Sequence, residues 1–292
     1  MSYISDFKTA AIGLFQQGYG PVPANSTSST VGTGTLAPEI FAEVGQKFTT
    51  ADGRTLALVA NGATALAAGV LVQAPAEVTA FEKLSMTITT APYTAEGGLT
   101  QIYVTNGSTV LNVNQYQGGY AIVAAGTGIG QSYRISTHGA AANGAKFVVN
   151  LEDAIIATST TLNTSGLYPG LDATSKISLI ANPYNGVIIN PTTATGAPVG
   201  VSMYPLAAST AATYNATSGL LTTAGVNQYG FIVTHGFASC LIDTETVVGY
   251  PMGRSAGTPG AVSRATFTTA AQVGISGQTT TSGQNGLISL FL

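Results

Sequence analysis

Short runs of Thr, Val, Ile, Tyr and Ala, separated by Gly, Asn and Pro, fill the chain from Gln46 onward. Runs of this length and composition, bounded by turn residues, are typical of β-strands. Their number predicts a mainly β fold, with a β-sandwich or β-barrel-like body of many short strands. The expected strands are 47–49, 55–59, 70–73, 84–89, 101–104, 120–124, 132–136, 146–151, 178–180, 187–189, 199–207, 229–234, 238–242 and 287–292.

Turn residues support this interpretation. Asn-Gly or Asp-Gly pairs lie between many of the runs, and hairpin turns favour residues that accept positive φ. The pairs are at 52–53, 61–62, 106–107, 143–144 and 185–186.

The first 36 residues differ from this body. Residues 1–20 carry apolar side chains at three- and four-residue spacing, which predicts a helix. Pro21 and Pro23 end that pattern, and residues 21–36 are rich in Pro, Ser, Thr and Gly, as in an extended arm. We therefore expect a helix and arm over 1–36 and an all-β body over 37–292, with a short helix from Pro38. A polar break near 163–175 would either divide the body in two or form a loop within it.

Charge is scarce. Only 7% of the 292 residues are charged, against roughly 25% in a typical soluble domain. The net charge is −3 and no cluster of Lys or Arg occurs, so nucleic acid is not expected as a partner. Exposed strands of monomers usually carry charges that prevent edge-to-edge pairing, which indicates that other protein covers much of this surface.

Membrane and secreted classes are also disfavoured. The most apolar window, 56–72, is rich in Ala and interrupted by Asn and Gly, so no transmembrane helix and no membrane partner are predicted. The N-terminus has Asp6 before its first cation, Lys8, unlike a secretory signal. The single cysteine, Cys240, cannot form an internal disulfide. We expect a protein made in a cytoplasm.

Candidate catalytic residues are few. His138 and His235 are the only histidines, and a nucleophile from Ser136, Ser239 or Cys240 beside one of them is conceivable. No nucleophile-elbow motif accompanies them, so hydrogen-bonded structural histidines and a core cysteine are favoured. Residues 126–130, GTGIG, lack the following helix of a dinucleotide site and instead predict a tight turn.

Two acidic pairs remain, Glu152 with Asp153 and Asp243 with Glu245. A glycosidase would need opposed carboxylates in a cleft usually lined by aromatic side chains, and the chain has no Trp. Neither pair has the dense oxygen spacing of a calcium loop. We therefore expect strand-end or turn roles for both pairs, with no catalytic residue, no metal and no cofactor.

Two phrases carry a family resemblance. Residues 45–54, GQKFTTADGR, followed by 61–69, NGATALAAG, and Gln73, resemble the opening of capsid cement or decoration proteins of tailed bacteriophages. Later phrases at 126–133, 182–187 and 229–240 agree with it. The resemblance covers most of 45–292 in its Gly- and Thr-rich composition and short motifs, but it includes no catalytic motif. Residues 1–36 are not part of it.

This resemblance implies a non-enzymatic virion subunit on the outer surface of the phage capsid. Such a subunit clamps neighbouring copies of the major capsid protein and assembles with itself, as a homotrimer or a dimer. An extended arm can reach a distant subunit and become ordered on binding. For the N-terminal segment we expect either this partner contact or packing on the chain's own body. Its apolar anchors are Tyr3, Ile4, Phe7, Leu14 and Phe15.

A receptor-binding or fibre-type protein that recognises host-surface glycan is the alternative. Low charge, abundant Thr and Gly, and many β-turns fit that class as well. A repetitive period or a coiled-coil stem would distinguish a fibre, and neither is visible in the sequence.

Overall fold

The computed structural model describes residues 43–82, 86–89, 95–162, 166, 168–265 and 272–292. The expected N-terminal helix and arm, the start of the helix at Pro38 and the anchors Tyr3, Ile4, Phe7, Leu14 and Phe15 lie outside the described residues.

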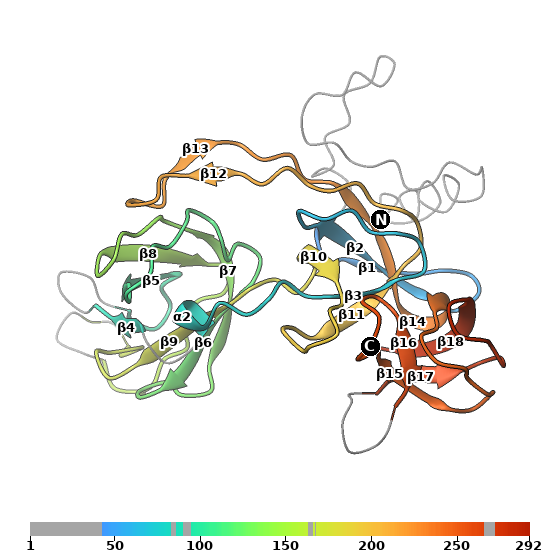
Figure 1. The fold of residues 1–292 in the computed structure, drawn as a ribbon. Helices are drawn as coiled ribbons and strands as arrows, with labels where there is room; N and C mark the ends of the chain where they lie inside the picture. The colour runs from blue at the N-terminus through green and yellow to red at the C-terminus, as the bar shows by residue number, and fades with distance from the viewer. Residues whose placement is uncertain (1–42, 83–85, 90–94, 163–165, 167, 266–271) are drawn as a thin grey trace, which may run out of the picture. The chain divides into compact units, whose positions relative to one another are not determined.

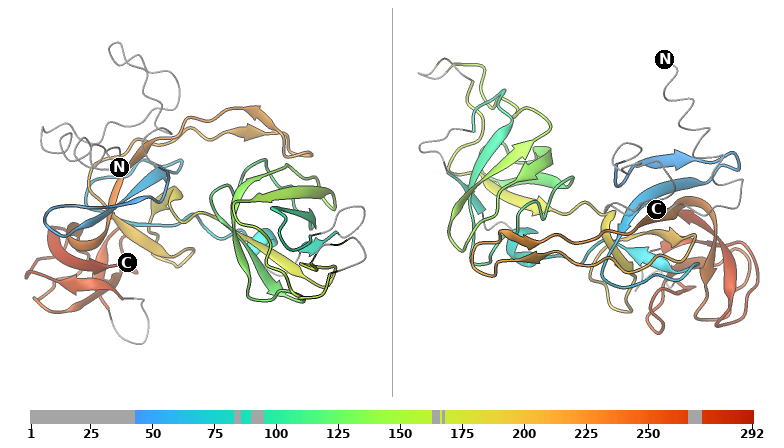
Figure 2. Two further views of the ribbon diagram at one scale, coloured as in Figure 1. Left: turned by 180° about the vertical axis from the view of Figure 1, so that it is seen from behind. Right: turned by 90° about the horizontal axis from the view of Figure 1, so that it is seen from above.

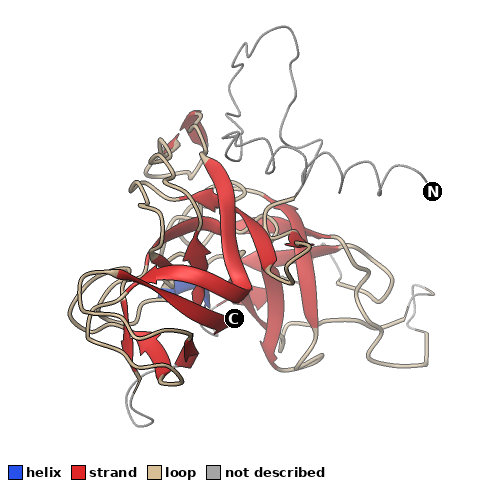
Figure 3. Ribbon diagram, turned by 90° about the vertical axis from the view of Figure 1, so that its right-hand side faces the viewer, coloured by secondary structure: helices blue, strands red, loops and turns tan. Residues whose placement is uncertain are grey.

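The fold is mainly β, as the sequence predicts (Figure 1). The helix α2 (Thr79–Glu82) is a single turn, and strands and loops make up the rest of the described chain (Figure 3). Two compact units form. The described residues up to Ala76, with Pro183–Ala211 and Gly225–Leu292, form unit 1, and Glu77–Asn182 with Ala212–Ala224 form unit 2. The region 163–175, where the sequence suggested a division, lies inside unit 2.

Unit 2 is built on a closed six-stranded antiparallel barrel, with the strand order β4-β5-β8-β7-β6-β9. The barrel is the green part of the chain in Figure 2. Every barrel strand alternates between side chains that point into the core and side chains that point outward, as the two-residue period of a strand requires. The strands are β4 (Met86–Ile88), β5 (Gln101–Thr105), β6 (Tyr120–Ala125), β7 (Ser132–His138), β8 (Lys146–Leu151) and β9 (Lys176–Ile180).

The pairing of this barrel is internally symmetric. If β4, β5 and β6 exchange places with β7, β8 and β9 respectively, the same strands remain neighbours around the barrel. The isolated bridges obey the same exchange: Ala95, before β5, pairs with Leu171, before β9, while Ala141, before β8, pairs with Leu111, before β6. The barrel therefore consists of two interlocked three-stranded halves.

Unit 1 contains two rings of paired strands that share one long strand, β14 (Tyr229–Leu241). In the first ring, β14 pairs with both β11 and β2, which closes the order β2-β10-β3-β11-β14, while β1 pairs with β2 from outside. These strands are β1 (Lys47–Thr49), β2 (Thr55–Asn61), β3 (Leu71–Gln73), β10 (Asn185–Ile189) and β11 (Pro198–Ser202).

The second ring follows the other half of β14. Its order is β14-β18-β17-β15-β16, and the bridge between Ile242 and Val262 returns it to the end of β14. The strands are β15 (Pro251–Arg254), β16 (Val262–Arg264), β17 (Gln272–Ser276) and β18 (Asn285–Phe291).

Strands β2, β3 and β11 of the first ring are buried on both faces over most of their length. Leu71 belongs to one apolar core, together with the second ring, whereas its neighbour Val72 belongs to another core. On β14, Val233 belongs to the same core as Leu71, and its neighbour Ile232 belongs to the same core as Val72. Consecutive buried residues are the expected pattern for a strand covered on both sides.

Two of the expected Asn-Gly turns depend on a buried asparagine side chain. The amide of Asn61 donates to the carbonyls of Thr64 and Ala207, and its oxygen accepts from the Gly62 N–H. Asn106 in unit 2 donates to Thr109, Ala141 and Ala142 and accepts from the Gly107 N–H. Because every buried amide atom has a partner, each asparagine fixes the chain that leaves its strand.

Candidate interaction surfaces

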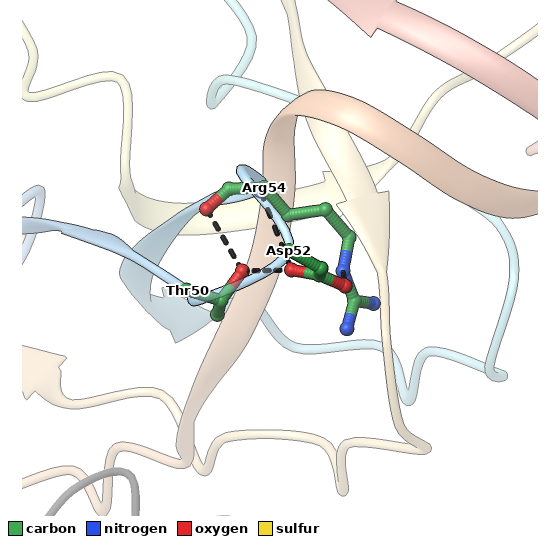
Figure 4. Close-up of polar contacts among 3 residues, drawn as sticks. All are labelled: Thr50, Asp52 and Arg54. Carbon is green, nitrogen blue, oxygen red and sulfur yellow. Dashed lines mark hydrogen bonds and ion pairs between the residues drawn. The ribbon is translucent and has the colours of Figure 1, made fainter.

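The β1–β2 turn lies within the phrase that carries the family resemblance, and its polar residues form one network (Figure 4). The Thr50 hydroxyl contacts the Asp52 carboxylate and the Arg54 carbonyl, and Arg54 Nε lies 2.7 Å from Asp52 Oδ2. Hydrogen bonding from Thr50, followed by contacts with Arg54, lowers the pKa of Asp52. These residues close a hairpin, so the phrase encodes a turn rather than a reactive group.

His138 is a structural residue at the end of β7. Its Nε2 accepts a 2.9 Å hydrogen bond from the Tyr116 N–H, and its Nδ1 lies 2.9 Å from the Gly139 carbonyl. This pair of contacts assigns the neutral tautomer with the proton on Nδ1. Burial lowers the pKa of His138, which is 2% exposed. Both ring nitrogens are occupied, as the structural interpretation of this histidine predicts.

The second histidine and the cysteine lie on β14. His235 is exposed and is paired with Phe291, whereas Cys240 is fully buried in the core of the second ring. Burial raises the pKa of the Cys240 thiol to about 12, so almost no thiolate forms at neutral pH. Ser239 points to the opposite face of the strand from Cys240, since adjacent side chains alternate. The expected core role of Cys240 is confirmed.

The acidic residues serve turns and strand ends. The carboxylate of Asp243, which follows β14, accepts hydrogen bonds from the hydroxyls of Ser255 and Thr258, and these bonds lower its pKa. Glu152, which follows β8, lies 3.3 Å from Arg134. Within the described ranges, no group of three or more His, Cys, Asp or Glu side chains is positioned to hold a metal ion.

The GTGIG segment is a tight connection between β6 and β7. Gly126 has a φ of 80°, and a Cβ at this position would lie 2.1 Å from the Thr174 carbonyl oxygen. The Thr127 hydroxyl donates a 2.7 Å hydrogen bond to Asp172, which lowers the pKa of that carboxyl. The loop is closed by a neighbouring turn, as predicted, and its Ile129 side chain is 69% exposed.

A cavity of about 300 Å³ in unit 1 offers little chemistry. Arg54 is the only charged residue that lines it, beside Ser202, Tyr204, Ser239 and Asn285. The Arg54 side chain already pairs with Asp52 outside the cavity. No acid, base and nucleophile converge there, so the cavity does not resemble an active site.

The strands β12 (Thr213–Tyr214) and β13 (Leu221–Thr223) form a hairpin (Figure 1). Its two strands pair only with each other among the described residues. The carbonyl of Gly219, in the turn between β12 and β13, accepts a 3.1 Å hydrogen bond from the Val113 N–H. Leu220 is 59% exposed and Leu221 is 49% exposed. The hairpin therefore presents apolar side chains and open strand edges.

No charge protects this hairpin. Residues 177–242 contain no Asp, Glu, Lys or Arg. Natural edge strands are usually protected from other strands by charged residues, Pro or a bulge. The hairpin has one register shift, between Thr213 and Tyr214, but neither Pro nor charge. Its edges are open to a further strand.

A second surface, without Asp, Glu, Lys or Arg, lies on unit 1 on the solvent side of β14, β18 and β17. We call it the outer face. Its apolar residues are Phe237, Ile275, Leu287 and Phe291, of which Phe237 is 54% exposed and Phe291 is 44% exposed. The exposed polar residues His235 and Ser239, with Ser289, lie among them.

No helix of the described chain has the length and apolarity needed to cross a membrane. No protein-family model matches the chain, and no curated protein or solved structure matches it either.

Sequence reasoning missed both surfaces. The strands β12 and β13 carry Thr, Ala and Leu that resemble the surrounding loop, and the outer face has a Ser in the middle of its apolar residues. The uncharged stretch from 177 to 242 was the one available signal for the hairpin.

Proposed function

We propose that the chain is a non-enzymatic structural subunit that binds the outside of a tailed-phage head and clamps neighbouring major capsid proteins. The observation that carries the proposal is the β12–β13 hairpin, which exposes apolar side chains and unprotected edges in an uncharged stretch. The groups most suited to catalysis support it, because His138, Cys240 and Asp243 are engaged within the fold.

The hairpin suits strand addition to a partner sheet. Main-chain hydrogen bonds along an edge supply affinity, and alternate side chains supply specificity. A two-stranded hairpin is only marginally stable alone, so a third strand from a capsid subunit would gain stability for both partners. Many copies on one shell would multiply modest single contacts.

Binding to emptied, expanded phage heads tests the proposal. The full-length chain should sediment with heads in a saturable, stoichiometric way and should raise their melting temperature. Leu220→Lys should weaken that binding about tenfold or more, because it places a charge directly before β13, where the charge opposes the addition of a further strand. Val248→Lys is the matched control, since Val248 is also 59% exposed but lies in a turn of unit 1.

Host cells serve as the second binding target in the same assay. Binding to cells and not to heads would overturn the proposal in favour of glycan recognition. If Leu220→Lys and Val248→Lys bind heads equally well, the hairpin is not part of the contact. The head itself would still be the binding partner.

The N-terminal contact remains a prediction and is tested with the full chain. Phe7→Ser combined with Leu14→Ser should weaken binding to heads if the segment contacts a partner. Gln16→Ser, a polar neighbour, is the control. If the segment packs on its own body instead, the double variant should lower thermal stability and leave head binding unchanged.

A further inference from the structure

The connection from β10 to β11 crosses over strand β3 in unit 1. Both strands are neighbours of β3 and run antiparallel to it, so β10 and β11 are parallel to each other. Asn190 follows β10 and donates its N–H to the Leu71 carbonyl, whereas β11 begins at Pro198, opposite Gln73 at the other end of β3. Residues 190–197, which we call the crossover, must therefore return across one side of β3.

Hydrogen bonds show which side of β3 the crossover covers. The Thr195 hydroxyl accepts a 2.8 Å hydrogen bond from Gln73 Nε2, and the Ala197 carbonyl accepts one from the Ala74 N–H. The side chain of Gln73 points to the opposite side of β3 from that of its neighbour Val72, because adjacent side chains in a strand alternate. The crossover therefore lies over the side of β3 that faces away from Val72.

Two buried side chains at the crossover carry polar atoms that lack a protein partner. Asn190 is 1% exposed and Gln73 is fully buried. In the part of the chain that the structure describes, neither the nitrogen nor the oxygen of the Asn190 amide has a hydrogen-bond partner, and Gln73 Oε1 also has none. The amide of Asn61 in the same unit is just as buried, yet both of its polar atoms bond to protein groups. Burial in unit 1 therefore does not by itself leave an amide unpaired.

The strand register brings these unpaired atoms to the same side of the β3–β10 pair. Gln73 is opposite Ile188 on β10, and Asn190 is two residues farther along the chain. Side chains on such a diagonal are within reach of each other when one of them is long, as glutamine is. Their unpaired atoms are one amide nitrogen, which donates, and two oxygens, which accept. The site therefore suits a ligand that can both accept and donate hydrogen bonds.

Water fits this site better than an ion does. Buried polar groups without protein partners are usually satisfied by internal water, which makes about three hydrogen bonds. A buried ion would need an opposite charge or a shell of oxygen ligands, and neither residues 71–76 nor residues 185–202 contain a charged side chain. Because both amides are closed off from solvent, the smallest polar molecule is favoured.

We propose that buried water binds at the crossover, where it accepts a hydrogen bond from Asn190 Nδ2 and donates one to Gln73 Oε1. Water that donates to Asn190 Oδ1 completes the site. The bound water ties the crossover to β3 without any charged residue. This inference concerns the interior of unit 1 and goes beyond the proposed function, so it stands or falls independently of head binding.

Nuclear magnetic resonance of the full-length chain tests the site without a substitution. The side-chain amide protons of Asn190 should show an Overhauser effect to water, with the sign of a residence time longer than molecular tumbling. Rotating-frame measurements separate this effect from proton exchange. Asn61 is the matched control, because its equally buried amide donates to protein carbonyls. An Asn190 signal no larger than that of Asn61 would overturn the inference.

Oxygen-17 relaxation dispersion provides an independent count of long-lived internal water. Asn190→Leu, which keeps the shape of the side chain but removes its polar atoms, should lose at least one such water relative to the wild type. Asn185→Leu, at the exposed start of the same strand, should lose none. A folded Asn190→Leu variant with an unchanged count would overturn the inference. A crystal structure in which the Asn190 amide bonds directly to Gln73, with no water between them, would also overturn it.

Discussion

Strand β8 of unit 2 and strand β3 of unit 1 have similar apolar sequences but bury them differently. In β8, Phe147, Val149 and Leu151 are buried and alternate with more exposed neighbours. In β3, Leu71, Val72 and Gln73 are all buried. A closed barrel gives each strand one inside and one outside, whereas the strands of the first ring separate two cores.

The difference shows how a small-residue chain obtains enough core. A six-stranded barrel of short strands can be filled by one side chain from every second position. The first ring of unit 1 is narrower by one strand, and five of the nine buried residues in one of its cores are Val. Its second, outward-facing core adds the apolar contacts that the narrow interior lacks.

Paired alanine substitutions test this comparison most directly. Leu71→Ala should lower the free energy of unfolding by about 2–5 kcal/mol, and Val72→Ala by about 1.5–3 kcal/mol, because both side chains are fully buried. In β8, Val149→Ala should be similarly costly, while Val148→Ala should cost less than about 1 kcal/mol. Denaturant unfolding measures all four. An equal cost at Val148 and Val149 would contradict the one-sided burial of β8.

The two histidines allow a second comparison. His138→Phe should cost about 1–3 kcal/mol, because it leaves the buried Tyr116 N–H without an acceptor. His235→Gln, at an exposed site, should stay within about 0.5 kcal/mol. Thermal melts at neutral pH measure both.

The pH dependence follows from the lowered pKa of His138. Below the ordinary histidine pKa of 6.5, the unfolded chain binds a proton that the folded chain excludes, so the stability from this residue falls as pH decreases. The destabilisation caused by His138→Phe should therefore shrink with acid. A difference that stays constant from neutral pH to pH values well below 6.5 would contradict the buried neutral histidine.

The smallest expected effects concern one aspartate in each unit. Asp172→Asn and Asp243→Asn should each cost about 1 kcal/mol at neutral pH, since both carboxylates order turns through hydroxyl donors near the surface. The pKa of each carboxyl is lowered below 3.8 in the folded chain. The contribution of each carboxylate to the free energy of unfolding is therefore present above pH 3.8 and disappears as the pH falls through the folded pKa. Melts from neutral to acidic pH measure the loss. Unequal losses would show that one turn carries more of its unit's stability.

Alternating apolar residues made unit 2 the easier unit to predict. The expected strand at 146–151 matches β8, and that at 120–124 falls one residue short of β6. In unit 1, two expected strands, 229–234 and 238–242, are the single strand β14. The prediction was wrong there because Thr-His-Gly interrupts the apolar pattern, and the register shifts between Val233 and His235 without ending the strand.

The strands β15, β16 and β17 were not predicted, since Gly, Ser and Arg dilute their apolar residues. Local sequence identified the structural roles of His138, Cys240 and Asp243, which depend on residue type and neighbours. It could not identify the hairpin surface or the outer face. The outer face depends on which residues become opposite one another across strands that are distant in sequence.

Strand β14 also determines the order in which the chain can fold during synthesis. All six barrel strands lie between Met86 and Ile180, so a ribosome delivers the whole barrel before it makes β14. The first ring cannot close until Tyr229–Leu241 emerges to pair with β2, which was made far earlier. By then β10 and β11 have already emerged and can pair with both edges of β3, so the edges that still lack a partner are those of β2 and β11 that β14 joins. Unpaired strand edges favour aggregation in slowly folding β proteins. The edges of β2 and β11 are therefore the last edges of the first ring to be covered as the chain is made.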